Sequence, residues 1–127
     1  MASKIEDIRE TLTNFMRTVE TFDLARCARF FEEDAQMFSP VGAFPKRLDG
    51  RAAILKQFEA IFALIRQSPE PFKIEPYDLD IREVGSMALV TFHLRQPGPV
   101  HRRTFVMRET ADGWRIVHIH ASIASPT

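Results

Sequence analysis

The spacing of apolar side chains predicts three helices in the first half of the chain. Ser3, followed three residues later by Glu6, has the pattern of a capping box, and a 3.6-residue apolar period then runs to about Phe22. Asp23 can cap a second, shorter helix that is ended by the acidic run at residues 32–34. Asp49 can cap a third helix over residues 51–66, whose apolar side chains share one side: Ile54, Phe58, Ile61, Phe62 and Ile65.

In the second half of the chain, apolar and polar side chains alternate with a two-residue period, which is typical of strands. After a short strand at residues 35–39 and an irregular loop over residues 40–48, strands are expected at residues 74–83, 87–95, 100–109 and 113–122. Asp112-Gly113 is the strongest hairpin signal between them. This order predicts one α+β domain over residues 1–127, with three N-terminal helices on one face of a curved antiparallel sheet.

The last strand has two different faces. Alternation places one set of its side chains together: Trp114, Ile116, His118, His120 and Ser122. The hairpin at Asp112-Gly113 adds Arg103, Phe105 and Met107 to that face, so Arg103 should lie close to His120. The simplest register across the turn at residues 97–99 adds Val90, Phe92 and Leu94, and leaves His93 outside.

Composition narrows the function classes. Lys plus Arg and Asp plus Glu both number 17, which argues against a nucleic-acid or membrane surface as the main partner. The single cysteine, Cys27, cannot form an internal disulfide, and residues 1–20 show no signal-peptide pattern, so we expect a cytoplasmic protein. Eleven Phe against one Tyr and one Trp indicate an interior lined by aromatic rings without polar tips.

Several motifs resemble the nuclear transport factor 2-like superfamily, also called SnoaL-like or ketosteroid-isomerase-like, over essentially the whole chain. They are Glu33-Asp34-Ala35 through Pro40-Val41-Gly42, then Leu48-Asp49-Gly50-Arg51, and the end from Asp112 to Ser122. The end is also similar to the association domain of calcium/calmodulin-dependent protein kinase II, where a Trp-to-His-x-His-x-Ser strand recurs. The resemblance implies a cystatin-like cone, with the curved sheet wrapped around the first and third helices and a pocket at its wide end. It does not imply one activity, because the superfamily hosts both enzymes and non-catalytic assembly domains.

The chemistry of ketosteroid isomerases does not carry over to these residues. The resemblance places that family's aspartate base at Ser39, its helix-1 tyrosine at Phe15 and its late-strand donor near Thr104 or Phe105. A serine cannot hold the transferred proton and a phenylalanine cannot donate a hydrogen bond, so steroid-type isomerisation is not expected. The lack of an acidic residue at these positions also argues against aldol cyclisation of the SnoaL type.

The paired histidines allow two interpretations. As a His-x-His metal pair they would need a third ligand, for which His101 is the best-placed residue, and we expect no metal and no cofactor. As pocket residues, His120 is the best candidate for catalysis, although whether the protein is an enzyme stays open. Cys27 lies on the apolar side of the second helix and is expected to be a core residue.

These observations predict a pocket for a small, mostly apolar ligand with a carbonyl or carboxylate end. The expected ligand-binding residues are Phe15, Phe38, Phe58, Phe62, Arg103, Phe105, His118 and His120. The alternative is a non-catalytic homo-oligomerisation module. In many members of the superfamily the outer sheet face forms a dimer interface, so we expect a homodimer through a set of apolar or small residues on that face: Val106, Val117, Ile119, Ala121 and Ile123.

Overall fold

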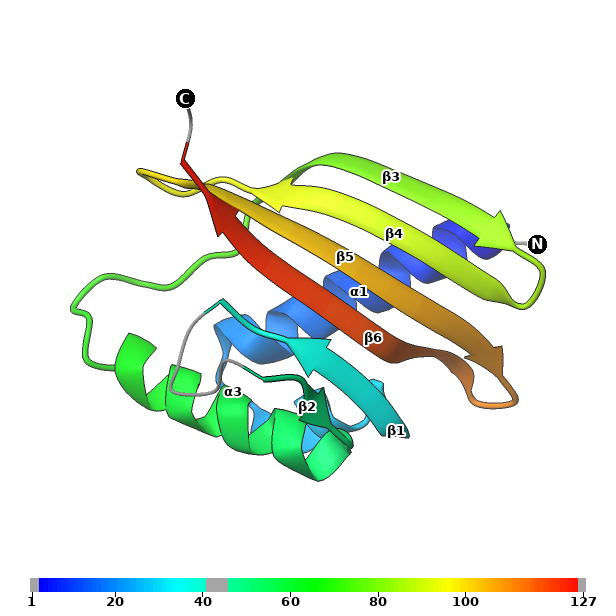
Figure 1. The fold of residues 1–127 in the computed structure, drawn as a ribbon, viewed down its shortest axis with the longest axis horizontal. Helices are drawn as coiled ribbons and strands as arrows, with labels where there is room; N and C mark the ends of the chain where they lie inside the picture. The colour runs from blue at the N-terminus through cyan, green and yellow to red at the C-terminus, as the bar shows by residue number, and fades with distance from the viewer. Residues whose placement is uncertain (1–2, 41–45, 126–127) are drawn as a thin grey trace.

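The computed structural model describes residues 3–40 and 46–125, which form one curved sheet with helices along it (Figure 1). The elements are α1 (Lys4–Glu20), α2 (Leu24–Ala28), β1 (Phe31–Phe38), β2 (Leu48–Asp49), α3 (Arg51–Ile65), β3 (Pro76–Val84), β4 (Met87–Leu94), β5 (Val100–Thr110) and β6 (Gly113–Ala124). The strand order is β2-β1-β6-β5-β4-β3, and all neighbours are antiparallel except β1 and β6. The predicted α+β fold is confirmed, with the addition of one parallel pair that joins the two halves of the chain.

The first two helices begin where their capping residues predict. The Glu6 amide donates to Ser3 Oγ at 3.1 Å, and the Arg26 amide donates to Asp23 Oδ1 at 3.1 Å. The turn between them places Phe22 at a φ of 55°, a left-handed conformation that a bulky residue seldom adopts. Its ring packs against Phe62 and Phe72, with centroids 5.5 Å and 6.4 Å away, and these contacts offset the backbone strain.

Two predicted boundaries around β1 are wrong. The acidic run at residues 32–34 does not end α2, because α2 already ends at Ala28 and the run lies inside β1. Asp49 does not cap α3, because the N-cap is Gly50 at a φ of 93° and Asp49 lies in β2. The Gly50 amide donates to the carbonyl of Ala35 at 2.8 Å, which ties the start of α3 to β1. Of the predicted loop at residues 40–48, residues 41–45 lie outside the described residues.

Phe15 is the centre of the aromatic core. Four rings pack edge-on against it, with centroid distances of 5.5–6.1 Å: Phe30, Phe31, Phe58 and Phe105. Each such pair contributes about 0.5–1.5 kcal/mol beyond the burial of its area. These rings come from α1, β1, α3, β5 and the turn before β1, so this one side chain holds the helices against the sheet.

A β-bulge at Val117 changes which residues of β6 face the core. Met107 pairs with Ile116, but Val106 pairs with His118, so Val117 has no partner on β5. Trp114 and Ile116 point inward before the bulge. Ile119 and Ala121 point inward after it, with 2% and 5% of their surfaces exposed.

The predicted inward orientation of His118 and His120 is therefore wrong. A regular strand would bury two imidazoles in an apolar interior, at about 1–3 kcal/mol for each polar group left unpaired. It would also expose Ile119, whose burial stabilises by roughly 1.5–3 kcal/mol. Both contributions favour the bulge.

The predicted faces of β4 and β5 agree with the register. Val90 pairs with Phe105 and Phe92 with Arg103, and all the apolar members of these two pairs are buried. His93 lies on the outer face, stacked on Tyr77 with centroids 5.2 Å apart. The inner face of this half of the sheet is thus apolar except toward the end that carries Arg103.

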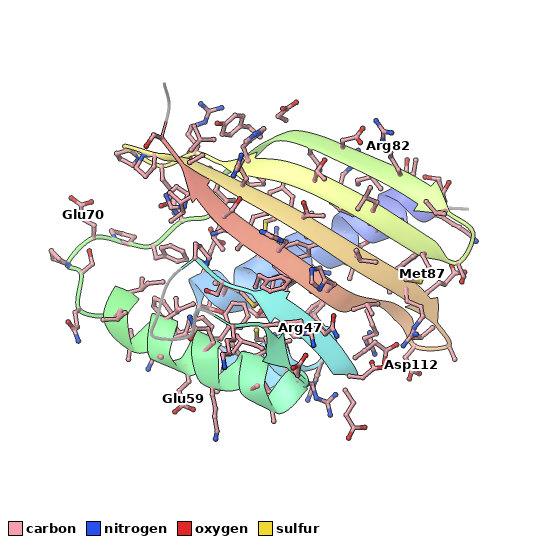
Figure 2. All side chains as sticks on the ribbon, in the orientation of Figure 1. Arg47, Glu59, Glu70, Arg82, Met87 and Asp112 are labelled. Carbon is pink, nitrogen blue, oxygen red and sulfur yellow. The ribbon has the colours of Figure 1, made fainter. Side chains whose placement is uncertain are left out.

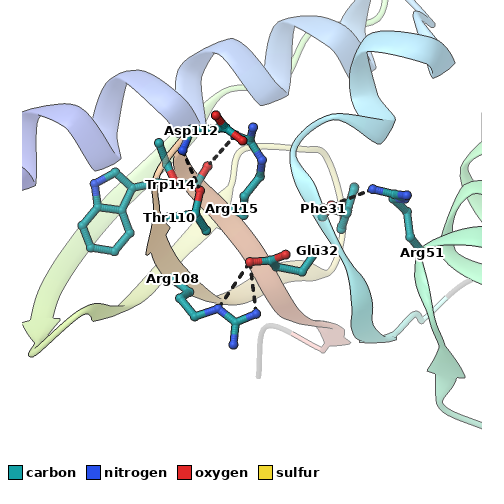
Figure 3. A network of polar contacts seen from close by, with 9 residues as sticks. Phe31, Glu32, Arg51, Arg108, Thr110, Asp112, Trp114 and Arg115 are labelled. Carbon is teal, nitrogen blue, oxygen red and sulfur yellow. Dashed lines mark hydrogen bonds and ion pairs between the residues drawn. The ribbon is translucent and has the colours of Figure 1, made fainter.

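Charged side chains lie around the outside of the molecule. Glu59 of α3 and Arg82 of β3 point away from the body (Figure 2). Arg108 reaches from β5 to Glu32 of β1, with Nη2 and Oε1 3.0 Å apart, and so links the two neighbours of β6 (Figure 3). Within the described ranges, no helix is both long and apolar enough to cross a membrane.

Candidate functional site

A cavity of about 340 Å³ opens between the helices and the inner face of the sheet. α1, α3, the segment before β3 and strands β1, β4, β5 and β6 all contribute to its wall. The wall is mostly apolar. Among the described residues its polar side chains are few: Ser39, Gln96, His101 and Arg103. A concave, apolar volume of this size with a few polar groups is typical of a small-molecule site.

Arg103 brings a positive charge to this apolar wall. Its neighbours across the sheet are Phe92 on β4 and Ala121 on β6, both buried. Its Nη1 donates to the carbonyl of Arg102 at 2.9 Å, and no carboxylate of the described residues lies within 4.0 Å of the guanidinium. Burial lowers the pKa of Arg103 to about 10, so the group stays charged at neutral pH.

His101 lies two residues before Arg103 on the same face of β5. It pairs with Ile123 on β6 and Leu94 on β4, which also line the cavity. Desolvation lowers the pKa of His101, and the nearby charge of Arg103 lowers it further. The imidazole is therefore neutral at pH 7 and can accept or donate a hydrogen bond beside the guanidinium.

The positions that carry acids and donors in ketosteroid isomerases hold other groups here. Ser39, Phe15 and Phe105 line the cavity, whereas Thr104 pairs with His120 on the outer face. Ser39 Oγ accepts from Gln57 Nε2 at 3.2 Å, and Gln57 is itself buried. No Asp or Glu belongs to the described part of the wall. Acid–base chemistry that depends on a carboxylate therefore has no residue to perform it among these side chains.

The structure brings together four of the eight predicted ligand-binding residues. Phe15, Phe58, Arg103 and Phe105 line the cavity. Phe62 is buried beside Phe58, with centroids 5.9 Å apart, but does not reach the wall.

The remaining three form a separate cluster on the outer face. The ring of Phe38 lies 5.9 Å from His118 and 5.3 Å from His120. His120 therefore does not lie beside Arg103, contrary to the sequence-based expectation, and its place in the cavity is taken by Ile119 and Ala121.

The outer histidines and the cysteine show little sign of special reactivity. Desolvation lowers the pKa of His118, with smaller contributions from His120 and Arg47, so this imidazole is neutral at pH 7. Cys27 is fully buried, and burial raises its pKa to about 12, as expected of a core residue. Among residues 3–40 and 46–125, no three His, Cys, Asp or Glu side chains gather closely enough to hold a metal ion.

The outer face of the sheet differs from the prediction in its residues. Ile119 and Ala121 are buried on the inner side, and Ile123, although 38% exposed, lines the cavity, so these three residues do not belong to the outer face. Val106 and Val117 are partly exposed. Three apolar residues that the sequence analysis did not assign to the outer face are exposed there: Val84, Leu89 and Phe38, the last of which was expected in the pocket.

Comparison with known proteins gives a consistent picture of the fold. The family model described as a SnoaL-like domain matches residues 8–126. Among solved structures, an NTF2-like protein of unknown function from Pseudomonas putida KT2440 is 22% identical, with a TM-score of 0.79 over 92% of this chain and 84% of that one. A proposed dehydratase of the NTF2-like family from Streptomyces avermitilis is 21% identical, with a TM-score of 0.79 over 95% and 96%.

A third solved structure has the same fold. It is a proposed calcium/calmodulin-dependent protein kinase type II association domain from Thiobacillus denitrificans ATCC 25259. It is 21% identical, with a TM-score of 0.74 over 91% of this chain and 93% of that one. The comparison with curated proteins finds no significant match.

Proposed function

Because this chain belongs to the SnoaL-like family of the nuclear transport factor 2-like superfamily, we propose that its cavity binds a small, mostly apolar molecule with a carboxylate or carbonyl end. The observation that carries the proposal is the guanidinium of Arg103, which has no carboxylate partner among the described residues and lies in a mostly apolar wall. A guanidinium can grip a carboxylate with two parallel hydrogen bonds. The apolar wall then takes the rest of the ligand.

His101 supports the same orientation of the ligand. As a neutral imidazole beside Arg103, it offers a second hydrogen bond to the polar end. If the bound molecule is transformed, His101 is the titratable group of the described wall best suited to accept a proton, and Arg103 would stabilise an oxyanion formed next to it. Proton transfer of this kind would resemble the dehydratase and isomerase activities proposed for two similar structures.

The test compares two neighbouring arginines on opposite faces of β5. Phenylbutyrate and its alcohol analogue phenylbutanol would be titrated into wild type, Arg103→Met and Arg102→Met, with binding measured by calorimetry. Arg102 is exposed and its Nε donates to Ser122 Oγ at 3.0 Å, so Arg102→Met removes an equal charge outside the cavity. We expect Arg103→Met to weaken phenylbutyrate binding by about tenfold or more, because one charged hydrogen-bond pair is lost. The same substitution should leave phenylbutanol binding unchanged. Equal effects of the two substitutions on phenylbutyrate would overturn the proposal.

A second candidate function is self-association through the outer face of the sheet. It is favoured by the exposure of Leu89, Phe38 and Val84 on that face, and one similar structure is a proposed association domain. In this case Arg103→Met would leave the assembly unchanged, because Arg103 lies on the opposite face. We further propose a cytoplasmic location, which fits a single, buried, unpaired thiol.

A further inference from the structure

A second cleft, of about 600 Å³, lies on the other side of α1 from the apolar cavity. Its wall contains Asn14, Arg17, Thr18 and Thr21 of the α1 region, whereas the cavity is lined by Phe15, Met16 and Val19 of the same helix. α2, the residues that follow it and β6 complete the cleft with Asp23, Arg26, Arg29, Phe30 and Arg115. The contact between Phe15 and Phe30, with centroids 5.7 Å apart, lies between the two spaces.

The cleft concentrates positive charge in a chain that has none in excess. Four guanidinium groups and a single carboxylate line it, although the whole chain has equal numbers of basic and acidic residues. The carboxylate of Asp23 is engaged: it caps α2 at the Arg26 amide and lies 3.5 Å from Arg26 Nε. Among the described residues no carboxylate lies within 4.0 Å of the side-chain nitrogens of Arg17, Arg29 or Arg115.

The arginines come from separate elements that the fold holds together. The turn at Phe22, with the Asp23 amide donating to the carbonyl of Thr18 at 2.8 Å, folds α2 back onto the end of α1. Arg115 extends from β6 toward α1, and its Nη1 donates to the carbonyl of Trp114 at 3.3 Å (Figure 3). Arg115 is partly buried and belongs to β6, so the sheet positions one of the four guanidinium groups of the cleft.

We propose that this cleft binds a small molecule with two adjacent phosphate groups, or an equally charged pair of oxyanions. Guanidinium forks match phosphate oxygens in two-pronged geometry, and a single monoanion would leave most of the four unmatched. The other side chains of the wall fit a polar ligand: the amide of Asn14 can donate a hydrogen bond to it, and Phe30 offers one apolar contact. The volume is that of a small-molecule site. This site is independent of the ligand proposed for the apolar cavity.

Inorganic pyrophosphate is the first probe, and its binding is measured by calorimetry at several chloride concentrations. We expect saturable one-to-one binding that is tighter than that of inorganic phosphate and that weakens as salt is added. Arg29→Gln and Arg115→Gln should each weaken pyrophosphate binding by about tenfold, the loss of one charged hydrogen-bond pair. Arg9→Gln, an exposed position on α1 outside the cleft, is the matched control and should change it less than twofold.

Two further measurements keep the result decisive. Thermal unfolding of each variant shows whether it is folded, and Arg103→Met should bind pyrophosphate like wild type because Arg103 belongs to the other cavity. Absence of saturable binding to folded wild type would overturn the proposal. So would equal weakening by Arg9→Gln and Arg115→Gln, since that would reflect net charge alone.

Discussion

Arg102 and Arg103 are neighbours in the sequence with opposite surroundings. Arg102 points outward and donates to Ser122, whereas Arg103 lines an apolar cavity and has a pKa lowered to about 10 by burial. The two guanidinium groups are chemically identical, so the difference comes from the face of β5 on which each lies. At this scale the binding proposed for the cavity depends on Arg103, whose guanidinium has no carboxylate within 4.0 Å among the described residues.

The pKa of His101 gives a prediction about pH. Because the folded-state pKa lies below the ordinary value of 6.5, the protonated form is disfavoured in the fold, and the stability from this residue is lost as the pH falls from 6.5 through the lowered folded-state pKa. A bound carboxylate would stabilise the protonated form, so phenylbutyrate should bind more tightly as pH falls from 7.5 to about 5.5. Calorimetry at several pH values tests this expectation. His101→Asn should flatten the pH dependence and His93→Asn, on the outer face, should not; an equally steep profile in His101→Asn would contradict the assignment.

Phe15 is the residue whose loss should cost most stability. Phe15→Ala removes a ring with four aromatic neighbours and should destabilise the fold by about 3–5 kcal/mol, the range for such truncations in cores. Ile5→Ala, on the same helix at 36% exposure, should cost less than about 1 kcal/mol. Urea denaturation followed by circular dichroism measures both. A loss below about 1.5 kcal/mol for Phe15→Ala would show that this ring is not the centre of the core.

At the scale of the element, the bulge in β6 decides the chemistry of the cavity. One unpaired residue, Val117, reverses the inward and outward faces for the rest of the strand. The histidines consequently move to the outer face, next to Phe38, and Ile119 and Ala121 complete the apolar wall.

The two possible registers of β6 predict opposite results for a pair of substitutions. In the bulged strand, Ile119→Asn buries an amide and should cost at least about 3 kcal/mol, whereas His120→Asn changes an exposed side chain and should cost less than about 1 kcal/mol. A regular strand would reverse this order. Chemical denaturation of the two single variants distinguishes them, and a larger loss for His120→Asn would disprove the bulge.

At the scale of the whole molecule, the sheet has one covered face and one uncovered face. The helices and the cavity occupy the inner side, while Leu89 at 39% exposure and Phe38 at 37% lie on the outer side. The outer residues also include Thr91, Thr104 and His120, so the face is mixed in polarity. Such a mixture of apolar and polar side chains resembles a non-obligate protein interface, which has an apolar centre and a polar rim, more than it resembles a protein interior.

Self-association through this face can be tested by measuring the molar mass of the protein in solution. Light scattering during size-exclusion chromatography should give a dimer for wild type and a monomer for Leu89→Glu, which places a charge among the outer apolar residues. Leu64→Glu, on α3 at 66% exposure, is the matched control and should leave the dimer intact. A monomeric wild type at concentrations of about 0.1 mM would exclude the interface for this protein.

The sequence by itself determined the elements and the fold. Capping residues located the starts of α1 and α2, the change from a 3.6-residue to a two-residue period separated helices from strands, and Asp112-Gly113 placed the last hairpin. These features depend on local conformation and on neighbours a few residues away, so they can be recognised from the sequence alone. Family resemblance supplied the cone, and with it the cavity near Phe15, Phe58, Arg103 and Phe105.

Only the tertiary structure decided which way β6 faces. The sequence contained the signal, since Ile116, Val117 and Ile119 leave both faces of the strand apolar, but a regular strand and a bulged one fit that pattern equally well. The choice depends on pairing with β5 and on the cost of burying two imidazoles against the helices, which are contacts between segments distant in the chain. For the same reason the arginine cleft, gathered from α1, α2 and β6, was visible only once those elements were packed together.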